Sequence, residues 1–155
     1  MSSQLIVLLI SMLPVIELRG AIPVGISIYH ISAWVAFFWS VLGSIISVIF
    51  VILILDLLIN KFLIQRIYFF NRFFTWLFEK TKKHHFKQFE RWRDLALIIW
   101  SAIPLPGFGA WTGALLAFVF GIPLKRAFPL IGLGVAIAGA IVTLITVGII
   151  NLPFI

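Results

Sequence analysis

The chain has 155 residues, of which 63% are hydrophobic and 11% are charged, and this composition excludes an ordinary soluble domain. Without any cysteine it forms no disulfides, thiolate metal sites or cysteine nucleophiles. Most of the net charge of +7 is concentrated, since nine of the twelve Lys and Arg residues lie within residues 61–93, between two apolar blocks. This pattern is typical of a cytoplasmic loop, so we expect a multi-pass cell-membrane protein, in a bacterial or archaeal inner membrane, with no nucleic-acid partner.

Prolines and glycines break the first apolar stretch, residues 4–30, around one acidic and one basic residue. These residues are Pro14, Glu17, Arg19, Gly20, Pro23 and Gly25. As one continuous helix the stretch would be ~40 Å long, well over the ~30 Å hydrocarbon core of a bilayer. We therefore expect a re-entrant hairpin, with arms near 5–16 and 24–33 that enter and leave by the same face.

Glu17 and Arg19 are the strongest functional signal, because ionised groups inside a membrane usually pair and mark a pathway. Two residues apart, they would not face each other on an α-helix. We expect an extended tip between Pro14 and Pro23, where both side chains point to one side. Such a tip would offer the guanidinium to an anion while the carboxylate titrates. The alternative is a structural ion pair that holds the hairpin together.

Two later stretches, residues 33–59 and 127–152, are long and nearly free of charge, and each is predicted to span the membrane. Both carry small residues at four-residue spacing, which lets membrane helices approach closely. The rows are Ser40 and Ser44; Gly43 and Ser47; Gly132, Ala136 and Ala140; Gly139 and Thr143.

The segment between them, residues 61–94, is aromatic and basic, and we expect a cytoplasmic amphipathic helix in the interface plane. One helical side would carry Phe62, Phe69, Phe73, Trp76 and Leu77. His84 and His85 have no further ligands at useful spacing, so we expect no metal site.

The remaining apolar stretch, residues 95–122, is broken like the first, and we expect a second re-entrant hairpin. Its break contains Pro104, Pro106, Gly107, Gly109, Trp111, Thr112 and Gly113. The backbone amides there, with Trp111 and Thr112, are candidates to line a cavity for an anion. A hairpin also keeps Lys125 and Arg126 on the cytoplasmic side with the other basic residues, as the positive-inside rule requires.

The two halves of the chain resemble each other weakly. Ser11-Met-Leu-Pro-Val15 parallels Ser101-Ala-Ile-Pro-Leu105, and each precedes a Gly-Ala pair and then a long apolar helix. We predict one all-α membrane domain, 1–155, made of two inverted repeats (1–60 and 95–155) joined by the interfacial segment 61–94. Each repeat would be a re-entrant helical hairpin plus one transmembrane helix. Broken helices at matching positions of inverted halves point to a transporter site near the midplane.

The segments Glu17-Leu-Arg-Gly-Ala-Ile-Pro23 and Pro104-Leu-Pro-Gly-Phe-Gly-Ala-Trp-Thr-Gly113 resemble the small multidrug export family over nearly the whole chain. That family looks distantly similar to the DedA-type proteins, whose fold has two oppositely inserted re-entrant hairpins. The resemblance implies a transporter or lipid translocase for lipid phosphates such as polyprenyl phosphates, with proton coupling. It also implies that Glu17 and Arg19 form the first hairpin tip. The chain departs from the DedA pattern in having no arginine in its second hairpin.

The leading hypothesis is a transporter whose site is built from Glu17, Arg19, Gly20, Pro23, Pro104, Pro106, Gly107, Gly109, Trp111 and Thr112. In it, Arg19 contacts an anionic lipid-type substrate and Glu17 carries the coupling proton. One alternative is proton-coupled efflux of hydrophobic cations, and another is a non-transporting scaffold that organises membrane lipids. No nucleophile–base pair or phosphate loop is present, so we expect no enzyme and no cofactor. Two spans and two hairpins are few to seal a pathway, so we expect a homo-oligomer.

Overall fold

The computed structural model of the chain describes residues 2–58, 72, 76 and 86–152. Its regular structure in these ranges consists of six helices, which confirms the predicted all-helical class for this part of the chain. They are α1 (Ser3–Met12), α2 (Glu17–Ser27), α3 (Ala33–Leu58), α5 (Phe86–Ala102), α6 (Ala110–Val119) and α7 (Leu124–Ile150). Most of the predicted interfacial segment, 61–94, lies outside the described residues, and its last part, from Phe86, begins α5.

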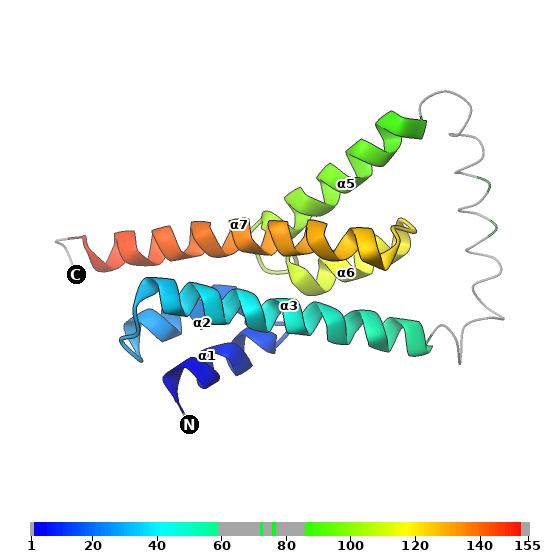
Figure 1. The fold of residues 1–155 in the computed structure, drawn as a ribbon. Coiled ribbons are helices and arrows are strands. Elements are labelled where there is room, and N and C mark those ends of the chain that lie inside the picture. The colour runs from blue at the N-terminus through cyan, green and yellow to red at the C-terminus, as the bar shows by residue number, and fades with distance from the viewer. Residues whose placement is uncertain (1, 59–71, 73–75, 77–85, 153–155) are drawn as a thin grey trace.

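The two long helices, α3 and α7, form the centre of the fold. They run side by side in opposite directions (Figure 1). Their 26 and 27 residues correspond to ~39 and ~40 Å, enough to cross a bilayer with some tilt. Spans within them reach a mean hydropathy of 2.7 and 2.5, so both are candidate membrane spans. Gly139 of α7 permits a close crossing, because a Cβ there would lie 2.9 Å from the ring of Phe37 on α3.

Three of the other helices are too short to cross a membrane. α1, α2 and α6 have 10, 11 and 10 residues, about 15–17 Å each. In Figure 1, α1 and α2 lie toward the end of the α3–α7 pair where both chain termini are found, and α5 and α6 lie toward the other end. Short segments that are not helical separate α1 from α2 (residues 13–16) and α5 from α6 (residues 103–109). We call them the first and the second break.

We expected an extended tip between Pro14 and Pro23, and this prediction is wrong. α2 begins at Glu17, and Pro23 lies inside it. Pro23 has no amide hydrogen to donate to the Arg19 carbonyl oxygen one turn earlier, and its ring crowds that carbonyl group. The helix nevertheless continues past Pro23 to Ser27, so the break is confined to residues 13–16.

In the first half, α1 packs on α3 through a serine and a glycine. A Cβ at Gly43 would collide with Ser11 and would lie 2.5 Å from the Leu8 carbonyl oxygen. Beside this contact, Ser47 Oγ donates a hydrogen bond to the Met12 carbonyl oxygen over 3.1 Å, and Ser44 Oγ donates to that of Ser11 over 3.5 Å. The predicted small-residue rows of α3 thus also satisfy carbonyl groups at the end of a broken helix.

In the second half, α5 packs on α7 through a similar pair. A Cβ at Gly134 would lie 2.6 Å from Ser101 Cβ and 2.7 Å from the Ile98 carbonyl oxygen. Ser101 also faces Gly113 of α6, where a Cβ would lie 2.5 Å from its hydroxyl oxygen. By contrast, no described atom lies within 4 Å of a Cβ at Gly132, so the predicted close packing is absent there within the described chain.

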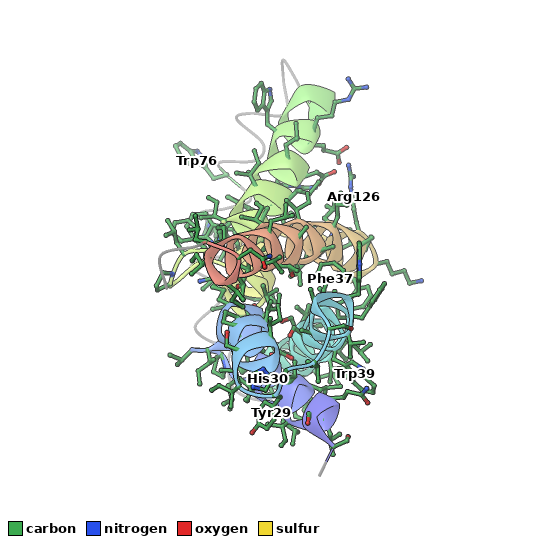
Figure 2. The ribbon with its side chains drawn as sticks, turned by 90° about the vertical axis from the view of Figure 1, so that its left-hand side faces the viewer. Tyr29, His30, Phe37, Trp39, Trp76 and Arg126 are labelled. Carbon is green, nitrogen blue, oxygen red and sulfur yellow. The ribbon has the colours of Figure 1, made fainter. Side chains whose placement is uncertain are left out.

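The outer surface is largely apolar, as a lipid-facing surface requires. Figure 2 looks along the bundle from the side where the chain termini lie, with Tyr29, His30 and Trp39 labelled near that end and Arg126 near α5. Trp34, at the start of α3, is 74% exposed. Tryptophan and tyrosine concentrate at membrane–water interfaces, so aromatic residues at this end of α3 fit an interfacial belt. Together with the two candidate spans, this surface indicates a membrane location.

Candidate functional site

The side chain of Glu17 links the start of α2 to the start of α6. Its Oε1 accepts a hydrogen bond from the backbone amide of Ala110 over 2.7 Å. Ala110 is the first residue of α6, and the preceding Gly109 offers no side-chain cap. A carboxylate at this position satisfies one of the free amides of α6 and complements the partial positive charge of its N-terminus. Glu17 is only 4% exposed, so the interaction is shielded from solvent.

Arg19 makes the opposite contact with α5. Its Nη2 donates a hydrogen bond to the Ile103 carbonyl oxygen over 3.3 Å, one residue beyond the end of α5. The same Nη2 lies 3.6 Å from Glu17 Oε2, which completes an ion pair. Within the described structure, the buried Nε of Arg19 has no hydrogen-bond partner. The acidic Glu17 thus caps the N-terminus of α6, and the basic Arg19 caps the C-terminus of α5. Each charge has the sign that the helix dipole favours at that end.

The backbone conformation of Glu17 explains how two residues so close in sequence pair at the start of a helix. Glu17 has a φ of 52°, in the left-handed region that non-glycine residues rarely adopt. It therefore departs from the helical direction that would point the two side chains apart. The predicted pairing is present, but it depends on this one strained residue and not on an extended tip.

Gly109 is required on the other side of the pair. Its φ is 133°, and a Cβ there would lie 2.7 Å from Arg19 Nη2 and closer still to Glu17 Oε2. Only glycine both adopts this conformation and leaves room for the two charged groups. Gly109 therefore lies against the Glu17–Arg19 pair, and its lack of a side chain lets the second break approach the start of α2.

A cleft of about 380 Å³ opens beside Arg19. It lies between α2, the start of the second break and the C-terminal part of α7. The residues that line it are Arg19, Pro23, Ser27, Pro104, Val142, Ile145, Thr146, Ile149 and Ile150. Of these, Arg19 alone carries a charge, and Glu17 does not belong to the lining. The arrangement is an apolar cleft with a guanidinium at one end.

The predicted site residues separate into two groups. Arg19, Pro23 and Pro104 line the cleft, and Glu17 and Gly109 lie directly behind Arg19. The others lie outside the lining: Gly20, Pro106, Gly107, Trp111 and Thr112.

Three of these five have identifiable structural surroundings. A Cβ at Gly20 would collide with Ile16, so glycine is needed there for packing within the first hairpin. Thr112 Oγ1 accepts a hydrogen bond from Trp100 Nε1 over 3.2 Å, which links α6 to α5. Trp111 Nε1 is buried, with no partner among the described residues. Pro106 and Gly107 are exposed in the break.

The predictions from the sequence did not include the residues of α7 that line the cleft. Val142, Ile145, Thr146 and Ile149 form one wall of the cleft, and their spacing places them on one face of the helix. Thr146 is the only polar residue of this face, and its hydroxyl donates to the Val142 carbonyl oxygen over 2.8 Å. An apolar face on a membrane helix gives no sequence signal that separates a cleft wall from a lipid-facing surface.

The described residues contain no group of three or more His, Asp or Glu side chains that could hold a metal ion. The charged groups that meet in this region, Glu17 and Arg19, bind each other and two helix ends. Their chemistry suits the binding of an ion or the transfer of a proton.

The chain matches a known protein family. Residues 17–141 match the family described as "Putative small multi-drug export protein", and the match begins at Glu17 and covers most of the chain. The chain therefore belongs to this family, whose description implies membrane transport. No curated protein and no solved structure matches the chain.

Proposed function

We propose that this member of the small multi-drug export family transports an amphipathic anion, and that Arg19 holds the anionic group in the cleft. The observation that carries the proposal is the composition of the cleft lining, in which one guanidinium is the single charged group among mostly apolar side chains, with Ser27 and Thr146 the polar ones. A planar guanidinium suits phosphate and carboxylate oxygens, which it can bind in a bidentate manner. The isoleucines of α7 would contact the apolar part of the substrate.

Efflux of hydrophobic cations is the alternative, and the family description names multi-drug export without naming a charge. A cation site needs a carboxylate that reaches the substrate, and the carboxylate of this region is engaged elsewhere. Glu17 Oε1 is bound to the Ala110 amide, and Oε2 faces Arg19. The cleft presents a positive group to its contents, so an anionic lipid-type substrate, such as a polyprenyl phosphate, fits it better.

The pair also provides a route for proton coupling, which forms part of the proposal. While Glu17 is ionised, it partly neutralises Arg19 and competes with a substrate anion for Nη2. A proton on Glu17 removes this competition and frees the guanidinium for the substrate. Proton binding and anion binding would then support each other, as coupling requires.

The proposed architecture is a pair of inverted repeats. The Ser11–Gly43 and Ser101–Gly134 contacts support it, because in each half a serine three residues before a proline packs on a glycine of the long helix. The placement of the two pairs of short helices toward opposite ends of α3 and α7 supports it too (Figure 1). We propose that both pairs are re-entrant and that the breaks meet near the midplane. Since this leaves few helices to seal a pathway, the functional unit is a homo-oligomer.

A reconstituted transport assay tests the proposal. Proteoliposomes would be offered a fluorescent lipid phosphate and a hydrophobic cationic dye side by side, with and without a pH gradient. The proposal expects movement of the lipid phosphate, accelerated by the gradient, and no movement of the dye above empty vesicles. Movement of the dye alone would establish the cation alternative. Movement of neither compound, with well-incorporated protein, would favour a scaffold.

A further inference from the structure

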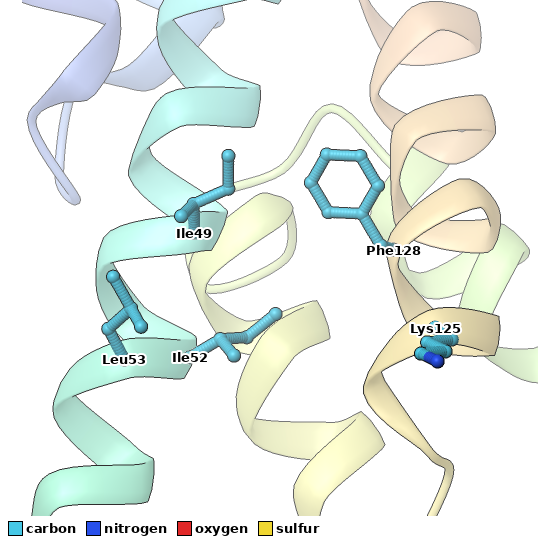
Figure 3. A pocket seen from close by; sticks show the side chains of 5 residues that line it. All are labelled: Ile49, Ile52, Leu53, Lys125 and Phe128. Carbon is cyan, nitrogen blue, oxygen red and sulfur yellow. The ribbon is translucent and has the colours of Figure 1, made fainter.

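A second cleft lies at the other end of α7, away from Arg19. Its volume is about 370 Å³, and its described lining residues are Ile49, Ile52 and Leu53 of α3 with Lys125 and Phe128 of α7. Figure 3 shows the α7 side chains opposite the three α3 side chains. The spacing within each set places its members on one helix face, so the cleft follows the line where the two helices meet.

Lys125 is the charged residue among the described lining residues of this cleft. The neighbouring Arg126 is engaged by two carboxylates of α5, since it pairs with Asp94 and its Nη1 lies 3.7 Å from Glu90 Oε2. Among the described side chains, Lys125 forms no ion pair. Its ammonium group lies beside lining residues that are otherwise apolar.

We propose that this cleft binds one anionic phospholipid, with the phosphate at Lys125 and an acyl chain along Ile49, Ile52, Leu53 and Phe128. Two observations select this occupant over a zwitterionic lipid or a helix of another protein. The first is the positive charge of Lys125, which is unpaired among the described side chains, beside an otherwise apolar lining. The second is the position of the cleft, where α7 begins and α3 approaches its end, next to the segment with most of the basic residues. Basic pockets between membrane helices on the cytoplasmic side suit anionic headgroups.

This lipid site is separate from the proposed transport site. The Arg19 cleft involves α7 from Val142 to Ile150, whereas the Lys125 cleft involves its first two turns. A lipid bound here would join α3 to α7 at the end opposite the chain termini. It would have a structural or regulatory role, independent of which substrate passes Arg19.

Photocrosslinking of the full-length protein tests the inference. The probe is phosphatidylglycerol with a photoreactive acyl chain, in phosphatidylcholine nanodiscs, and labelled peptides are mapped by mass spectrometry. Labelling is expected within residues 49–53 and 125–128. Lys125→Gln should lower it about fivefold, the effect of one basic residue near an anionic headgroup. Leu53→Trp should also lower it, by filling the cleft from an exposed position while Lys125 is retained.

Three controls make the result decisive. Arg91→Gln removes an exposed cation of α5 outside the cleft, and labelling should not change. The same photoreactive chain on phosphatidylcholine should label the cleft no more than other lipid-facing surfaces. Ile149→Trp, which fills the Arg19 cleft and leaves the Glu17–Arg19 pair intact, should leave the label in place, so a failure of the transport proposal would not affect this result. Equal losses in Lys125→Gln and Arg91→Gln, equal labelling by both lipids, or loss of label in Ile149→Trp would each overturn the inference.

Discussion

The carboxylate of Glu17 and the backbone amide of Ala110 are joined by a 2.7 Å hydrogen bond across the interior of the protein. The contact connects the first residue of α2 to the first residue of α6, although the two lie in opposite halves of the chain. Together with the hydrogen bond from Arg19 to the Ile103 carbonyl oxygen, this contact lets the start of α2 cap two helix ends, the C-terminal end of α5 and the N-terminal end of α6. The ion pair is therefore structural at the same time as it borders the cleft.

The two roles of Glu17 are separable by substitution. Both Glu17→Gln and Glu17→Ala leave Arg19 without its counter-charge, but Glu17→Gln keeps an oxygen that accepts from the Ala110 amide. Glu17→Ala also leaves that amide buried without a partner, which costs about 1–3 kcal/mol more. Unfolding in detergent should therefore show a clearly larger loss for Glu17→Ala. Similar losses in both variants would mean that the negative charge, and not the hydrogen bond, stabilises the fold.

Glu17→Gln also tests proton coupling. The neutral side chain mimics a protonated carboxyl group and no longer competes for Arg19. Transport of the lipid phosphate should continue but lose its response to a pH gradient in proteoliposomes. A variant that keeps the full response would show that the coupling proton is carried by another group.

Gly109→Ala should be among the most destabilising alanine substitutions in the chain. An alanine at this position would have to adopt a left-handed φ, and its Cβ would collide with Glu17 and Arg19. Gly107→Ala is the matched control, because Gly107 has a φ of 88° with no described atom within 4 Å of the added carbon. The control should lose about 1–2 kcal/mol from backbone strain alone. Gly109→Ala should lose at least ~1 kcal/mol more from overpacking. Equal thermal midpoints would contradict the close approach of the two breaks.

The two serine–glycine contacts should respond alike to substitution. Gly43→Ala and Gly134→Ala each place a Cβ against a serine and a backbone carbonyl group, which does not yield as a flexible side chain would. Each should lower stability by about 1–3 kcal/mol. Gly148→Ala, in α7 with no atom of the described residues within 4 Å of the added carbon, should be neutral or stabilising by up to ~1 kcal/mol. Unfolding midpoints in detergent give the comparison, and a harmless Gly134→Ala would break the proposed correspondence between the halves.

Topology separates re-entrant hairpins from four full spans. Because the chain has no cysteine, single cysteines at Ser2, Arg91 and Asn151 can be labelled with a membrane-impermeant reagent in intact cells. Re-entrant hairpins place both ends outside and Arg91 in the cytoplasm, so only the end positions should react before permeabilisation. Four spans would place all three positions on one face. Protection of both ends together with Arg91 would rule out the inverted-repeat proposal.

The sequence predicted the helical class and the long helices well, for clear physical reasons. Long uncharged stretches form helices in a membrane because every backbone polar group must be satisfied internally. The predicted ranges 33–59 and 127–152 therefore correspond closely to α3 and α7. Paired charges in an apolar stretch were an equally direct signal, and Glu17 and Arg19 do form an ion pair.

The tertiary details could not be predicted in the same way. The left-handed conformation of Glu17 accompanies its contact with Ala110, a residue of the other half, and local propensity gives no sign of it. Pro23 looked like the end of the break, but it is accommodated within α2. The α7 wall of the cleft is an apolar face like many others in the chain. Each of these features depends on which helices meet, and that was not readable from the order of residues.

The central claim is that Arg19 in its apolar cleft binds the transported anion, and the most direct test is lipid-phosphate flux at equal protein incorporation. Arg19→Gln should abolish the flux, and Arg19→Lys should lose most of it, because a point charge does not reproduce the planar fork. Ile149→Trp should also block the flux, since it fills the cleft from a half-exposed wall position and leaves the Glu17–Arg19 pair intact. Arg91→Gln should transport normally. Normal flux in both Arg19→Gln and Ile149→Trp, with an intact fold, would contradict the account.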